Sequence, residues 1–156
     1  MVDMGNYFMM SIRFNKQSPE EFGLTLNDNS DTFVRLNDNS QWKKRPLYDY
    51  GWGEENGYYK VPMPSFDELV SIILQSKNED DKYGAAAVIL DDFCDELMEK
   101  CFEIFEDGKD VKKYFEFFRI LKLQNPINRS SIIGKHYSEV SKDFEKWKTI
   151  AKMVST

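Results

Sequence analysis

Apolar and polar residues alternate along the first third of the chain, which predicts β-strands. Every second residue from Phe8 to Phe14 is apolar, so a strand there would have one apolar face. The pentapeptide LNDNS occurs twice, at residues 26–30 and 36–40. Asn, Asp and Ser favour turns, because their side chains hydrogen-bond to the nearby backbone. Since alternating positions flank both repeats, we predict two hairpin turns of an antiparallel β-meander.

A further hairpin is predicted at Asn56-Gly57, a dipeptide that readily adopts the left-handed conformations of a two-residue turn. Its strands would lie near Tyr48–Trp52 and Tyr58–Val61. Two prolines follow, at positions 62 and 64. Because proline has no backbone N–H to donate to a ladder, we expect the sheet to end there.

Beyond the prolines the apolar period changes from two to 3.6, which predicts helices. Ser65 and Glu68 have the spacing of a capping box and open a helix that runs to about Ser76. A second helix is expected to be capped by Asp80 or Asp81. A third helix is expected to begin after a break at Asp91 or Asp92 and to run to about Phe105, with Gly108 as its stop. Two further helices are expected over Val111–Leu123 and Ser138–Val154.

Strands therefore precede helices, and this segregation indicates an α+β fold rather than a parallel α/β sheet. We expect a single domain over 1–156, β-rich in 1–62 and helical in 65–156, which is long enough to bury a core. In the helix at 111–123 the residues predicted to face inward are Val111, Tyr114, Phe115, Phe118 and Leu121.

The first LNDNS repeat also matches part of a calcium-binding loop that would start at Asn27. The position that requires glycine is Thr32, however, and Arg35 stands at an oxygen-ligand position. We therefore expect turns and no calcium site. Zinc sites need several Cys or His at short spacing, and His136 is the only histidine, so no metal or other cofactor is expected.

Cys94 and Cys101 lie on one face of a predicted helix, about 10 Å apart along its axis, which is too far for a disulfide. Their positions are apolar, so we predict buried free thiols. The longest apolar run, AAAVIL at 85–90, is too short to cross a bilayer, and the N-terminal residues do not resemble a signal peptide. Cytoplasmic localisation is expected, without membrane binding.

Catalytic motifs are scarce. A catalytic triad around His136 is not expected, because the sequence has no G-x-S-x-G nucleophile elbow. The dipeptide Gly134-Lys135 is not part of a P-loop, because the other residues of that motif are absent. Carboxylate pairs at i,i+4 are frequent between Asp91 and Glu103, but they occupy the helix face opposite the apolar stripe, where solvation is the usual role. We therefore predict a protein without enzymatic activity.

Charge is concentrated in residues 79–110, which hold twelve acidic and three basic residues, a net charge of −9 in a chain whose total is −6. Concentrated negative charge speeds association with a basic partner, and it argues against nucleic-acid binding. We predict that a basic protein partner binds an acidic helical face. Its residues are Asp91, Asp92, Asp95, Glu96, Glu99 and Glu103.

Aromatic residues gather in the predicted hairpin region and offer an alternative. Such rings can stack on sugars or anchor a protein partner, although they can equally pair across strands and cover a sheet. The alternative function is a small enzyme or a carbohydrate-binding domain that uses this region. The candidate residues, which are also secondary candidates for partner binding, are Trp42, Tyr50, Trp52 and Tyr58.

One segment, NEDDKYGAAAVILDDFCDELMEKCFEIFED, resembles small bacterial toxin-immunity proteins. The features shared are an acidic cap at Asp80-Asp81, the small residues of Tyr83–Ala87, and a second acidic helix with the step Asp95-Glu96-Leu97. The likeness covers about thirty residues. It implies a cytoplasmic inhibitor that binds and neutralises a bacterial toxin, and no residue roles follow from it.

Overall fold

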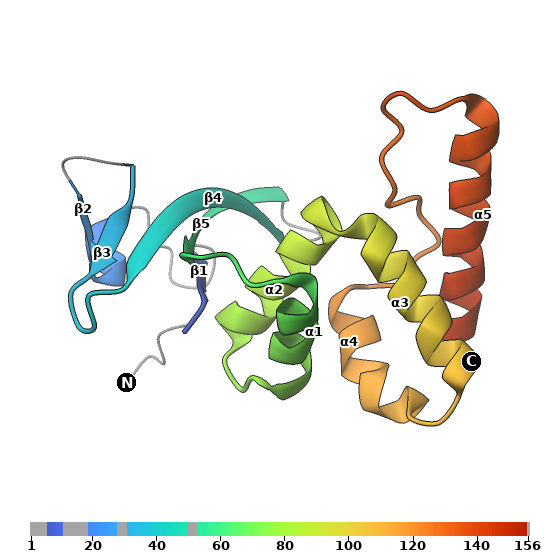
Figure 1. Cartoon of the computed structure of the whole chain (residues 1–156), viewed down its shortest axis with the longest axis horizontal. Helices are drawn as coiled ribbons and strands as arrows, with labels where there is room; N and C mark the ends of the chain where they lie inside the picture. Colours follow the sequence, from blue (N-terminus) through green and yellow to red (C-terminus); the bar gives the residue numbers. More distant parts are fainter. Residues whose placement is uncertain (1–5, 11–18, 28–30, 50–52, 156) are drawn as a thin grey trace. The chain divides into compact units, whose positions relative to one another are not determined.

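The α+β fold is confirmed by the computed structural model, which describes residues 6–10, 19–27, 31–49 and 53–155 (Figure 1). The chain forms two compact units, Met1–Ala87 and Val88–Thr156. The boundary between them falls inside a helix, so it does not coincide with the change from strands to helices.

The first unit contains an antiparallel sheet that, in the described residues, has five strands in the order β1-β5-β4-β3-β2. The strands, with one short 3₁₀ helix (η2), are β1 (Phe8–Met10), η2 (Pro19–Phe22), β2 (Leu24–Leu26), β3 (Phe33–Arg35), β4 (Gln41–Asp49) and β5 (Gly53–Lys60). Strands β2, β3 and β4 pair in sequence order, so the predicted meander is confirmed.

The second LNDNS repeat forms the turn between β3 and β4, whereas residues 28–30 of the first repeat lie outside the described chain. Asn39 adopts a left-handed φ of 59°. The Asp38 carboxylate accepts hydrogen bonds from the Ser40 N–H at 3.0 Å and hydroxyl at 2.6 Å. Arg35 also donates to Asp38, and these hydrogen bonds hold the pKa of Asp38 well below its usual value. The turn chemistry predicted from the sequence is therefore present.

The predicted turn at Asn56-Gly57 is wrong, because both residues lie within β5, opposite Pro46 and Arg45 of β4. A Cβ on Gly57 would come within 2.4 Å of Leu47 Cδ1. This glycine therefore makes room for a buried side chain of the neighbouring strand rather than for a turn.

Both faces of β1 are buried, which corrects the prediction of one apolar face. Met9 joins a core cluster on one face of the sheet. Phe8 is fully buried on the other face, against Gly84. The predicted continuation of this strand to Phe14 lies outside the described residues. The core cluster that contains Met9 also holds Phe22, Leu24, Trp42 and Tyr58, with Phe33 packed against it.

The helices are α1 (Phe66–Gln75), α2 (Glu79–Asp92), α3 (Cys94–Asp107), a 3₁₀ helix η3 (Val111–Tyr114), α4 (Phe115–Ile120) and α5 (Tyr137–Val154). Ser65 caps α1 through Glu68, as predicted. Helix α3 stops at the left-handed Gly108, also as predicted. The break expected at Asp91 or Asp92 falls instead at Phe93, because both acids belong to the last turn of α2.

Two helical predictions are wrong in detail. The cap of α2 is Asn78, whose Oδ1 accepts the Asp81 N–H at 3.0 Å, and not Asp80 or Asp81. The helix expected over 111–123 begins as η3 and ends at Ile120. Because a 3₁₀ turn has about three residues instead of 3.6, the inward positions shift. Phe115 is consequently exposed and Phe117 is fully buried in its place.

Gly84→Ala should destabilise the first unit. A Cβ at this position would lie 2.3 Å from Phe8 Cγ, inside a packed interior. Overpacking costs about 1–3 kcal/mol, which outweighs the roughly 1 kcal/mol that alanine gains in helix propensity. Urea denaturation measures the change in unfolding free energy. Adding Phe8→Leu should recover part of the loss, and purely additive effects of the two substitutions would contradict the contact.

Candidate functional site

The acidic face is defined as Asp91, Asp92, Asp95, Glu96, Glu99 and Glu103, and all six residues are exposed. The last four belong to α3. At about 100° per residue they fall within an arc of about 100°. Leu97, Cys101 and Ile104 are buried on the opposite side of the same helix. Amphipathic spacing thus buries one stripe of α3 and turns its carboxylates toward solvent.

Little positive charge compensates the four acids of this face that belong to α3. Asp95, Glu96, Glu99 and Glu103 form no ion pair with the cations of the described chain. Lys100 of the same helix is half-buried, with its Nζ 5.7 Å from the centre of the Tyr114 ring. The last turn of α3 carries no basic residue, although a cation there would be favoured by the helix dipole.

The concentration of acids costs stability. Three i,i+4 acidic pairs follow one another along α3, at 95/99, 99/103 and 103/107. Like-charge pairs at this spacing destabilise a helix by about 0.2–0.5 kcal/mol each. Acidic side chains at 106 and 107 also oppose the negative end of the helix dipole. Folding alone does not explain this arrangement.

Of the four aromatic candidates, the two that the structure describes are buried. Trp42 is fully buried, donates from Nε1 to Ser40 Oγ at 2.7 Å, and lies under the Arg35 guanidinium. Tyr58 is buried as well. Their place in the core excludes contact with a sugar or a partner, because both rings are covered by the folded sheet. Tyr50 and Trp52 lie outside the described residues.

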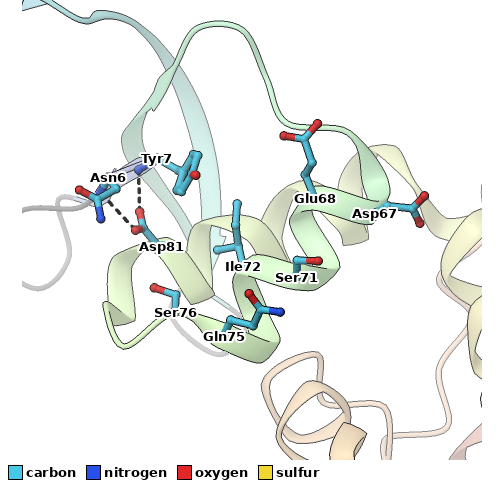
Figure 2. A pocket seen from close by; sticks show the side chains of 9 residues that line it. All are labelled: Asn6, Tyr7, Asp67, Glu68, Ser71, Ile72, Gln75, Ser76 and Asp81. Atoms are coloured by element: carbon cyan, nitrogen blue, oxygen red, sulfur yellow. Dashed lines mark hydrogen bonds between the residues drawn. The ribbon is translucent and has the colours of Figure 1, made fainter.

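A pocket of about 450 Å³ opens in the first unit beside α1 and the start of α2, and Asp81 lies at its edge (Figure 2). The sequence indicates Asp81 as a possible helix cap and includes it in the charge of residues 79–110, and the structure shows that this residue is buried. Its carboxylate accepts backbone N–H groups of three consecutive residues, Asn6, Tyr7 and Phe8, at 3.1, 2.8 and 2.9 Å. Both oxygens are thus occupied by the chain, which makes Asp81 a structural group rather than a catalytic one.

A sequence signal for Asp81 did exist. Asn78 and Asp81 have capping-box spacing, which places the acid in the first turn of the helix that Asn78 caps. The sequence could not show that β1 would supply the three N–H donors. Other acids of the pocket, Asp67 and Glu68, are exposed.

The remaining candidates of the sequence also have structural roles. His136 is the exposed N-cap of α5, and its N–H donates to the Glu139 carboxylate at 3.3 Å. Cys101 is buried and Cys94 is half-buried, with its thiol donating to the Leu90 carbonyl. Burial raises the pKa of Cys94 to about 11 and that of Cys101 to about 12.

Within the described residues, no three His, Cys, Asp or Glu side chains are grouped to hold a metal ion, and no helix has the length and apolar character needed to cross a bilayer. Comparison of the chain with protein-family models, curated proteins and solved structures finds no match. The acidic face is therefore argued from its own geometry.

Asp81→Asn should destabilise the protein by about 2–4 kcal/mol. Loss of the charge weakens three hydrogen bonds, and the amide NH₂ would oppose a buried N–H donor. Unfolding in urea at neutral pH measures the effect. Asp67→Asn is the matched control, because this acid is exposed and should change stability by less than about 0.5 kcal/mol. Equal effects of the two substitutions would contradict the structural role of Asp81.

Both thiols should react slowly with a thiol reagent at pH 8. Thiolate is the reactive form, and a pKa of about 11 leaves only about one thiolate in a thousand at that pH. Labelling of the native protein is expected to be at least ~100-fold slower than in urea. Fast native labelling, or loss of partner binding in a folded Cys94→Ala, Cys101→Ala variant, would show that the thiols are functional.

Proposed function

We propose that this chain is a non-enzymatic protein-binding module, an immunity-type inhibitor that neutralises a basic bacterial toxin domain through its acidic face. One observation carries the proposal: six exposed acids follow one another from the end of α2 along α3, with a cost to helix stability that the fold does not require. A basic partner would remove that cost, because its cations would pair with Asp95, Glu96, Glu99 and Glu103, which form no ion pair within the described residues. The resemblance of residues 78–107 to immunity proteins supports the same class.

The alternative, a carbohydrate-binding domain or small enzyme at the aromatic hairpin, has lost two of its four residues to the core. Stacking requires an exposed ring face, which Trp42 and Tyr58 do not offer. The acidic face, in contrast, keeps all six of its predicted residues at the surface.

Binding should depend on charge in a defined way. A display library of genomic fragments from the organism of origin is enriched on the protein, and the enriched fragments are expected to be basic. Their association rate should fall as salt rises from 0.01 to 0.15 M, because the Debye length shrinks from about 30 to 8 Å. The variant Asp92→Lys, Glu96→Lys, Glu99→Lys should slow association by at least ~10-fold while unfolding free energy changes little.

The control is Glu20→Lys, Asp67→Lys, Glu145→Lys, which makes the same change in total charge at three exposed positions that do not belong to the acidic face. It should bind nearly as the unmodified protein does. Equal loss in both triple variants would indicate net charge only, and unchanged binding in the first variant would refute the acidic-face proposal.

A further inference from the structure

The pocket beside α1 is large enough for a small ligand. Its volume of about 450 Å³ lies within the range of roughly 300–1,000 Å³ that is typical of small-molecule sites. On α1 its lining residues fall on two adjacent rows, because residues four apart share a face of a helix. At a rise of about 1.5 Å per residue, the row from 67 to 75 extends over about 12 Å. We name this cavity the α1 pocket, and its lining residues on α1 are Asp67, Glu68, Ser71, Ile72 and Gln75.

The middle of the α1 pocket is apolar. Ile72 is 8% exposed, and in Figure 2 its side chain points from α1 toward Tyr7, which lines the pocket from the other side. The ring of Tyr7 is partly open to solvent. The backbone of this residue is held in place, because its N–H donates to the Asp81 carboxylate at 2.8 Å. The apolar body of a ligand would therefore meet a fixed ring and a fixed helix.

The charge of the α1 pocket has one sign. Among the described residues that line it there is no lysine or arginine, whereas Asp67 and Glu68 are exposed carboxylates in the first turn of α1. Neither acid forms an ion pair with a cation of the described chain. This end of the pocket attracts a cation and repels an anion.

Glu68 is the better placed of the two acids. It shares a row of the helix with Ile72, whereas Figure 2 shows Asp67 turned away from Tyr7. One oxygen of Glu68, Oε1, accepts the Ser65 hydroxyl at 3.1 Å. The other oxygen has no hydrogen bond to the part of the chain that the structure describes, so it can accept one from a ligand.

Neutral polar groups continue the pocket toward the end of α1. Ser71 and Gln75 are exposed, and their side chains make no hydrogen bond with the described residues. A hydroxyl and an amide both donate and accept hydrogen bonds. Serine in the middle of a helix is a poorer helix former than leucine, so the stability of α1 does not explain its presence. Its small side chain leaves the middle of the pocket open.

We infer that the α1 pocket binds a small organic amine that has an apolar body and a neutral hydrogen-bonding group at its far end. The ammonium group pairs with Glu68, the body packs against Ile72 and Tyr7, and the neutral group bonds to Ser71 or Gln75. This site does not depend on the proposed binding of a basic protein, because the acidic face belongs to the other unit.

Two compounds of equal length test the inference. Aminohexanol has an ammonium group at one end of a six-carbon chain and a hydroxyl at the other, and hexanediol has hydroxyls at both ends. In ¹⁵N spectra of the full chain, aminohexanol should shift the amides of Tyr7, Ser71 and Gln75. Its affinity should be at least ~10-fold higher than that of hexanediol, because a hydrogen bond to a charged group is the stronger one.

Three variants assign the contacts. Glu68→Gln removes the charge and keeps the capping box, since glutamine also serves at this position, so it should weaken only aminohexanol binding. Ser71→Leu leaves the charge unchanged and fills the pocket. It should weaken both compounds at least ~10-fold without lowering the free energy of unfolding. Ser141→Leu, the same substitution at an exposed position of α5, is the matched control and should change neither affinity.

Several results would overturn the inference. Equal affinity for the two compounds would exclude the ammonium site. Amide shifts confined to the acids of α3 would show attraction to surface charge and no pocket binding. Unchanged affinity in Ser71→Leu would place the ligand elsewhere. None of these results bears on the acidic-face proposal, which is tested by the association of basic fragments and by charge reversal on α3.

Discussion

The structure of the first unit depends on the contact between strand β1, at the edge of the sheet, and the first turns of helix α2. Backbone N–H groups at the edge of a sheet must find acceptors, and those that lead into β1 find the Asp81 carboxylate. One turn further along α2, Gly84 leaves the space that Phe8 fills. Together the two contacts fix β1 in position and angle. Paired to β5 in this way, β1 covers the core cluster on its other face with Met9.

In the second unit, α3 and α5 pack through apolar stripes and differ in the charges that they expose. Acids occupy the exposed side of α3, while α5 exposes lysines at 142, 146 and 152. The two helices pack against each other through buried stripes that include Cys101 and Trp147. Since the packing uses the apolar stripes, the exposed charges are not needed to hold the helices together. The exposed residues of α3 are therefore available for binding, because the packing of the helices does not depend on them.

Sequence periodicity predicted the fold class, the meander, the cap at Ser65 and the stop at Gly108, because each rests on interactions between neighbours in the chain. Sequence periodicity failed where the local structure depends on contacts between residues that are far apart in the chain. Asn56-Gly57 has strong turn chemistry, yet the packing of Leu47 places it inside a strand. At Asn56-Gly57, tertiary packing outweighed the local preference for a turn. In β1, tertiary packing likewise buried the face that the alternating pattern left in solvent.

For the candidate site, too, the features set by neighbouring residues could be predicted and those set by distant residues could not. The acidic face could be predicted because amphipathic spacing along one helix decides which side meets water. Asp81 could not be separated from the surface acids, because the donors that bury it are more than seventy residues away in sequence. The exposure of two isoleucines between α4 and α5 was equally hard to predict. Apolar residues normally predict burial, and only the tertiary structure shows that Ile132 and Ile133 remain in water.

The acids of α3 repel one another at i,i+4 spacing, and this repulsion lowers the stability of the helix. Under the proposed function, binding would offset this cost. Long-range attraction would bring a basic partner to the acidic face, and its strength would decay with salt. In the complex, the partner's cations would supply the counter-charges that Asp95, Glu96, Glu99 and Glu103 lack within the described residues. The same acids that weaken the unbound helix would therefore speed its association with the partner.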